Sequence, residues 1–143
     1  MNNFKTIVLA TWIVVIAGFG QIVAAEVIPV QVGSQAATKI GIVISSNDPE
    51  TVWNAFRFAN FACQKGDSVS VFLLGKGVEA ETIKDKGFDV KGMMQSYVSN
   101  GGKIFTCGTC LKSRNAGGTE LCPISSMADM YAIVKQSDKL VTF

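Results

Sequence analysis

Short apolar runs alternate with amphipathic segments along most of the chain. Residues 39–45 (KIGIVIS), 68–74 (SVSVFLL) and 103–107 (KIFTC) are apolar and rich in β-branched side chains, as strands buried on both faces are. Residues 139–143 (KLVTF) end the chain with a similar run. Residues 49–65 instead place apolar side chains three and four positions apart, which is typical of a helix. The pattern therefore predicts strands that alternate with helices.

Capping and turn residues set the expected helix boundaries. Asp48, which precedes a proline, is a suitable N-cap for the first helix, and Gly66 is a suitable residue to follow its last turn. A last helix begins at a capping box made by Ser126 and Asp129. Two further helical stretches are expected after the second strand, over residues 78–86 and 90–100.

This order of elements predicts an α/β fold in which a parallel sheet is covered on both faces. Right-handed crossovers place the carboxyl ends of all parallel strands at one edge, where such sheets bind ligands. Three loops should reach that edge: residues 46–49, 75–77 and 107–114.

Several apolar side chains do not belong to the stripe that faces the sheet. Trp53, Phe58 and Phe61 lie off the stripe of the first helix, so we expect another subunit to cover them. Cys63 lies on the stripe and is expected to be a small buried apolar residue. The methionines at helical spacings are also expected in the core: Met93, Met94, Met127 and Met130.

The first 25 residues differ from the remainder and are typical of an export segment. Lys5 precedes an apolar run over residues 7–19, and the small residues that end at Ala25 suit a signal peptidase. We expect a secretory signal that is cleaved after Ala25. The alternative is an uncleaved anchor through residues 7–25, and the protein is expected at a membrane only in that case.

Both alternatives place the folded domain outside the cytoplasm. Lys5 precedes the apolar run and no Lys or Arg follows it before Lys39, so the positive-inside rule favours an exported protein, periplasmic or otherwise extracytoplasmic. The expected organisation is a signal peptide or anchor over 1–25, a linker over 26–38 and a domain over 39–143.

Composition limits the chemistry that this domain can perform. The chain has 143 residues, 48% of them hydrophobic, which is enough for one folded domain. Its net charge of +2 collects on no tail or face, so we expect no nucleic-acid partner. The sequence contains no His, so a catalytic site must rest on Cys, Lys, Arg or carboxylates.

Neither a nucleotide nor a metal cofactor is expected. Residues 75–80 (GKGVEA) match a dinucleotide-binding pattern, but they follow the second strand, and the next strand ends in Cys107 where a ribose-binding acid belongs. Cys107, Cys110 and Cys122 offer three zinc ligands, and a zinc site completed by Cys63 or a carboxylate is a less favoured alternative.

The segment CGTC, Cys107 to Cys110, is the strongest candidate for chemistry. In an exported protein its thiols could form a structural disulfide, and the spacing leaves all pairings of the four cysteines open. The favoured alternative is a reactive thiol, because Cys107 ends a strand where a helix begins, and free N–H groups there stabilise a thiolate. Cys107 is then the nucleophile and Cys110 the resolving thiol. Nearby groups that would support a thiolate are Gly108, Thr109, Lys112 and Arg114.

Four stretches of the sequence resemble a known family. KIGIVISSNDPETVWNAFRFANFA, VFLLGKGVEAE, CGTCLKSRN and CPISSMADM…LVTF are similar to the DsrE/DsrF (YchN-like) family of small sulfur-relay proteins. The resemblance implies a flavodoxin-like three-layer sandwich with a mostly parallel sheet of about five strands. It also implies a trimer or hexamer, and a cysteine that carries sulfur as a persulfide. Cys107, with Arg114 seven residues later, matches the layout of that cysteine.

The leading hypothesis is therefore a persulfide carrier or sulfurtransferase-like relay protein, rather than an enzyme that works alone. Its expected partners are sulfur donor and acceptor proteins or small sulfane-sulfur anions, and no cofactor is expected. The alternatives are an exported thiol–disulfide redox protein and a non-catalytic oligomeric binding module of the same fold. Cys107 and Cys110 are the candidate catalytic residues, and the candidate substrate-binding residues are Arg114, Lys112, Gly108, Thr109, Asn47 and Asp48.

Overall fold

Five parallel strands form the central layer of the protein, in a computed structural model that describes residues 36–143. The strand order is β4-β3-β2-β1-β5, so consecutive strands from β1 to β4 are neighbours and β5 pairs with the other side of β1. The strand bounds are β1 Lys39–Ile44, β2 Ser68–Leu73, β3 Lys103–Cys107, β4 Ile124–Ser125 and β5 Lys139–Thr142.

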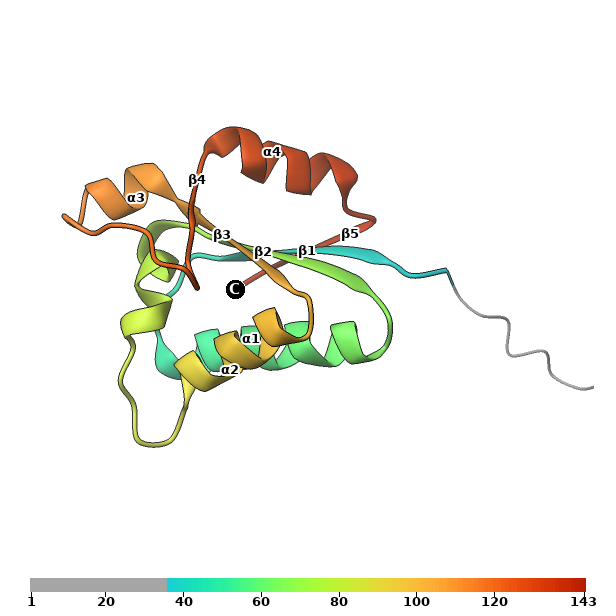
Figure 1. Ribbon diagram of the computed structural model, residues 1–143, viewed down its shortest axis with the longest axis horizontal. Helices are drawn as coiled ribbons and strands as arrows, with labels where there is room; N and C mark the ends of the chain where they lie inside the picture. The colour runs from blue at the N-terminus through green and yellow to red at the C-terminus, as the bar shows by residue number, and fades with distance from the viewer. Residues whose placement is uncertain (1–35) are drawn as a thin grey trace, which may run out of the picture. The chain divides into compact units, whose positions relative to one another are not determined.

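Helices cover both faces of this sheet, as the sequence predicts. Figure 1 shows α1 (Pro49–Gln64) and α2 (Val90–Ser99) on one face and α4 (Met127–Gln136) on the other. Two short helices lie at one end of the sheet: a 3-10 helix η1 (Gly75–Thr82) after β2, and α3 (Gly108–Lys112) after β3. The result is a three-layer, flavodoxin-like α/β sandwich.

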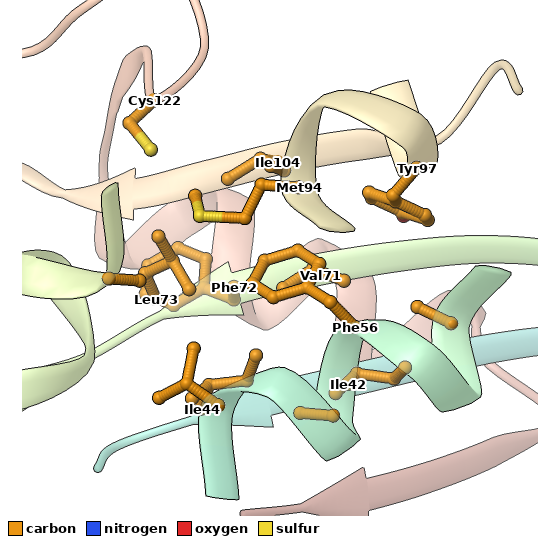
Figure 2. Close-up of a cluster of buried hydrophobic side chains, with 14 of the residues drawn as sticks. Ile42, Ile44, Phe56, Val71, Phe72, Leu73, Met94, Tyr97, Ile104 and Cys122 are labelled. Carbon is orange, nitrogen blue, oxygen red and sulfur yellow. The ribbon is translucent and has the colours of Figure 1, made fainter. Parts of the chain in front are cut away.

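The main core lies between the sheet and the helices α1 and α2. Figure 2 shows Phe56 of α1 and Tyr97 of α2 in one cluster with strand side chains such as Ile42 and Val71, all fully buried. The rings of Phe56 and Tyr97 pack with centroids 5.8 Å apart. The Tyr97 hydroxyl donates to the carbonyl of Val69 (2.7 Å) and accepts from the N–H of Lys103 (3.1 Å), so it links α2 to two strands.

Two segments between the strands differ from the sequence prediction. The helix expected over residues 78–86 is the 3-10 helix Gly75–Thr82, because the chain turns at once after β2 through Gly75, whose φ is +56°. The two-residue strand β4 was not expected. It pairs with the end of β3, with Cys107 opposite Ser125.

The helix α4 leaves more apolar surface exposed than expected. The predicted capping box is confirmed, since the Asp129 carboxylate accepts hydrogen bonds from the N–H and the hydroxyl of Ser126 at 2.7 and 2.8 Å. However, Met127 is 60% exposed, so its expected place in the core is wrong. Tyr131 and Val134 of the same helix are also exposed. This helix buries only part of its apolar surface against the sheet.

The aromatic residues outside the stripe of α1 divide into two groups. Trp53 is partly buried and packs against Phe88, with ring centroids 5.8 Å apart. Phe58 and Phe61 remain exposed. Cys63 is only partly buried, which corrects the expectation of a fully packed side chain.

The expected export segment, residues 1–25, and most of the expected linker lie outside the described residues. Within residues 36–143, no helix has the length and apolar character needed to cross a bilayer.

Candidate functional site

The three loops predicted to meet at the carboxyl edge of the sheet do so. Asn47, after β1, donates from Nδ2 to Oε2 of Glu79, after β2, at 2.8 Å. The N–H of Gly75, also after β2, donates to Sγ of Cys110, after β3, at 3.3 Å. The chain crosses to the opposite face of the sheet after β4, through α4 (Figure 1). An open α/β sheet forms its binding crevice where neighbouring connections diverge in this way.

Two thiols form the centre of this site. Cys107 ends β3 and is the N-cap of α3, and its Sγ accepts from the N–H of Cys110 at 3.4 Å. Cys107 is only 5% exposed, whereas Cys110 is partly exposed. All four cysteines of the chain, Cys63 and Cys122 included, are free thiols. A reagent that enters from solvent therefore meets Cys110 before Cys107.

The surroundings of the Cys110 thiol change its acidity. The pKa of Cys110 is raised, first by its hydrogen bond with the Cys107 side chain and then by burial, while the N–H of Gly75 opposes the rise. A thiol with a raised pKa keeps its proton at neutral pH, which makes it a poor nucleophile and a ready hydrogen-bond donor. Cys110 is thus suited to assist its neighbour rather than to attack.

A carboxylate that the sequence reasoning missed organises the polar side of the site. Glu79 Oε1 pairs with Nε of Arg114 at 2.6 Å, while its other oxygen accepts from Asn47. Nη1 of Arg114 donates to the carbonyl of Cys110 at 3.1 Å. The pKa of Glu79 is lowered, chiefly by its bond to Arg114 and then by the bond to Asn47. Glu79 therefore joins the loops after β1 and β2 to the cysteine segment.

The other predicted binding residues lie at the same edge but have different surroundings. Asp48 caps α1 by accepting from the N–H of Thr51 at 2.8 Å, and this bond lowers its pKa. Gly108 packs closely under β4, since a Cβ there would lie 2.9 Å from Cγ2 of Ile124. Thr109 and Lys112 point to solvent. Because α3 has only five residues, its dipole adds little to the stability of a thiolate.

The backbone conformation and packing of the GKG segment explain why glycines occupy its first and third positions. Gly75 takes a positive φ at the turn, and a Cβ on Gly77 would lie 2.1 Å from the carbonyl oxygen of Ile44. The pattern that resembles a dinucleotide motif is thus explained by a tight turn and by a close approach to β1.

Cys122 is buried and belongs to the hydrophobic core cluster (Figure 2). Burial, with a further contribution from the Glu81 carboxylate, raises its pKa to about 12. The Thr119 hydroxyl donates to Glu81 at 2.5 Å and accepts from the N–H of Cys122 at 2.9 Å. These hydrogen bonds connect the loop that contains Thr119 and Cys122 to η1. Cys122 is therefore a protonated, unreactive thiol at neutral pH.

A cavity of about 370 Å³ opens between η1, α3 and the loop that follows α3. Its lining includes Val78, Glu79, Leu111 and Arg114, with Cys122 also contributing. Within residues 36–143, no group of three or more His, Cys, Asp or Glu side chains could hold a metal ion. Arg114 and its partner Glu79 supply charged groups to the lining of this cavity.

Comparison with known proteins places the chain in a family. Residues 38–143 match the model of the DsrE/DsrF-like family. The uncharacterized protein MJ0989 of Methanocaldococcus jannaschii is 31% identical over 100 residues, which cover 66% of this chain and 88% of that protein. The uncharacterized protein MK0008 of Methanopyrus kandleri is 25% identical over 120 residues, which cover 78% of this chain and 99% of that protein.

A solved structure has the same fold. The YchN protein of E. coli superposes with a TM-score of 0.66, covers 76% of this chain and all of its own, and is 16% identical in sequence. At that identity the likeness concerns the fold alone. The family match covers the whole sheet, its helices and the cysteine segment, and on this ground the chain belongs to the DsrE/DsrF-like family.

Proposed function

We propose that this protein carries sulfur as a persulfide on Cys107, with Cys110 as the assisting thiol. One observation carries the proposal: two adjacent free thiols lie at the carboxyl edge of the sheet, and the sulfur of each accepts a backbone N–H. Membership of the DsrE/DsrF-like family supports a role in sulfur relay at the level of the family.

Loading requires a nucleophilic thiolate at Cys107. The thiolate attacks the outer sulfur of a polysulfide or thiosulfate, the S–S bond of the donor breaks, and the shortened polysulfide or sulfite leaves with the electron pair. The product is a Cys107 persulfide. The N–H of Cys110 points at Sγ of Cys107, where it stabilises negative charge on that sulfur.

Release reverses this chemistry toward an acceptor. A thiolate of the acceptor protein attacks the terminal sulfur of the protonated persulfide, and the Cys107 thiolate leaves as the S–S bond breaks. The Cys110 thiol, which holds its proton because its pKa is raised, stabilises that leaving thiolate by a hydrogen bond. No external oxidant or reductant is consumed, because the sulfane sulfur only changes its carrier.

The cellular setting belongs to the same proposal. The export segment predicted over residues 1–25 supports a relay outside the cytoplasm, and the proposed partners are sulfur donor and acceptor proteins or sulfane-sulfur anions. Homo-oligomers are proposed from the resemblance, and exposed apolar side chains on α4, such as Met127 and Tyr131, offer surface for a second copy. Light scattering on the purified protein tests this assembly, and a monomer at micromolar concentration contradicts it.

Intact-mass analysis after treatment with polysulfide tests the proposed function. The wild-type protein should gain one sulfur atom, and a dithiol should remove it. Peptide mapping should place that sulfur on Cys107. If treatment only joins Cys107 to Cys110 by a disulfide, with no sulfur gained, the alternative of a thiol–disulfide redox protein is correct.

A further inference from the structure

The guanidinium that the sequence reasoning assigned to an anionic substrate is already paired with a carboxylate. Nε of Arg114 lies 2.6 Å from Oε1 of Glu79, and the Asn47 amide holds the second oxygen of Glu79 at 2.8 Å. Glu79 is therefore fixed on both of its oxygens, by groups from two different loops. The Glu79 carboxylate therefore occupies the position on Arg114 where an anionic sulfur donor would bind.

The ion pair lies where incoming molecules can reach it. The side chains of Arg114 and Glu79 are 29% and 40% exposed, and both line the cavity of about 370 Å³ beside α3. Nη1 of Arg114 also donates to the backbone carbonyl of Cys110 at 3.1 Å, so the guanidinium contacts the segment that carries the two thiols. An anion bound to Arg114 would lie beside this segment.

We propose that Glu79 is a specificity-determining residue: its carboxylate occupies Arg114, so that an anionic sulfur donor must displace Glu79, whereas a neutral donor need not. This inference rests on the proposed function and names the donor class that the site favours. Neutral sulfane sulfur, such as a protein-bound persulfide in its protonated form or an organic trisulfide, is favoured over free thiosulfate.

The physical basis is competition between two anions for one cation. A dianion such as thiosulfate can bind Arg114 only if the Glu79 carboxylate gives up its own contact with Arg114. The displaced carboxylate then remains nearby and repels the dianion, because both are negatively charged. The pair is partly exposed, so water and salt reduce the effect to a few-fold rather than to complete exclusion. A neutral donor experiences neither the competition nor the repulsion.

Replacement of Glu79 by Gln isolates the charge, because the side chain keeps its shape and an acceptor oxygen for Arg114. Two alkylating reagents of nearly equal size, anionic iodoacetate and neutral iodoacetamide, report on the field at the thiols without any sulfur transfer. In the full-length protein, peptide mapping follows modification of the Cys107–Cys110 segment. The ratio of the two rates cancels changes in thiolate content, since both reagents attack the thiolate.

The ratio of the iodoacetate rate to the iodoacetamide rate should rise about twofold to fivefold in E79Q, and the rise should shrink at high ionic strength. Loading by thiosulfate should rise by a similar factor. Transfer from an organic trisulfide, in which the thiolate attacks the central sulfur, forms a mixed trisulfide and expels an alkanethiolate, should stay unchanged. The matched control is E81Q, which removes a carboxylate two positions away that pairs with Lys91 and Thr119 instead of Arg114.

An unchanged ratio in E79Q, or an equal rise in E81Q, overturns the assignment, because the effect would then not depend on the pairing with Arg114. The two proposals fail in different ways. If no donor loads sulfur on the wild-type protein, the proposed function fails, while the alkylation ratio still tests the role of Glu79.

Discussion

Replacement of Gly77 by Ala should both destabilise the domain and disturb the thiol site. A Cβ on this residue would lie 2.1 Å from the carbonyl oxygen of Ile44, far inside van der Waals contact. That oxygen cannot simply move away, because it accepts the N–H of Leu74 at 2.9 Å. The segment between Leu74 and Glu79 must therefore shift as a whole.

The magnitude follows from these two contacts. Overpacking of a well-packed interior costs about 1 to 3 kcal/mol, and loss of the Ile44–Leu74 hydrogen bond adds about 1 kcal/mol. We therefore expect a loss of about 2 to 4 kcal/mol in the free energy of unfolding. For a domain of this size, the melting temperature should fall by roughly 10 °C or more. The shift also moves the N–H of Gly75 away from Sγ of Cys110, which disturbs the thiol site.

Urea denaturation followed by far-UV circular dichroism measures the loss of stability. Gly117 provides the matched control, because a Cβ there meets nothing within 4 Å. G117A should remain within about 0.5 kcal/mol of the wild-type protein or be slightly stabilised. If G77A unfolds within about 0.5 kcal/mol of the wild type, the close packing of η1 against β1 is refuted.

Three further predictions concern the core, a helix end and the third thiol. Y97F should lose about 1 to 3 kcal/mol in urea denaturation, because the N–H of Lys103 and a carbonyl lose a buried partner. D129N should be less stable than the wild type above about pH 4, and the difference should vanish at lower pH. The pKa of Asp129 is lowered in the folded state, so its carboxylate stabilises the fold only while it is ionised. A difference that persists at pH 2 contradicts this reasoning. Iodoacetamide at pH 8 should modify the Cys107–Cys110 segment first and Cys122, whose pKa is about 12, only after unfolding; early modification of Cys122 contradicts this expectation.

The parts of the fold that follow from local pattern were predictable. Strands β1, β2 and β3 are apolar throughout because they are buried in the middle layer, and their loops meet at one edge because parallel connections require it. Asp48, the N-cap of α1, accepts an N–H of the first turn, and Asp129, inside the first turn of α4, accepts the N–H of the N-cap Ser126. Both side chains therefore mark helix starts. These features depend on neighbours in sequence, which a single chain displays directly.

The features that were missed depend on distant contacts. Strand β4 has two residues, and Ile124 is 64% exposed, so no apolar run marks it; its pairing with β3 defines it. Met127 and Tyr131 have the spacing of a core face, yet they are exposed to solvent, because spacing alone does not show which apolar side chains the sheet covers.

Glu79 is the clearest case of a missed site residue. In the sequence it is one acid among several polar residues after a glycine turn. Its role depends on Arg114, which follows 35 positions later along the chain. The useful signal was its place at the carboxyl end of β2, the edge where the other candidate residues gather.

The central claim is that sulfur resides on Cys107. The most direct measurement is intact-mass analysis of the wild-type protein, C107S and C110S after the same treatment with polysulfide. The account predicts that the wild type gains one sulfur atom that dithiol removes, that C110S still gains it, and that C107S does not. Equal loading of C107S, or no gain of sulfur by the wild type, contradicts the claim.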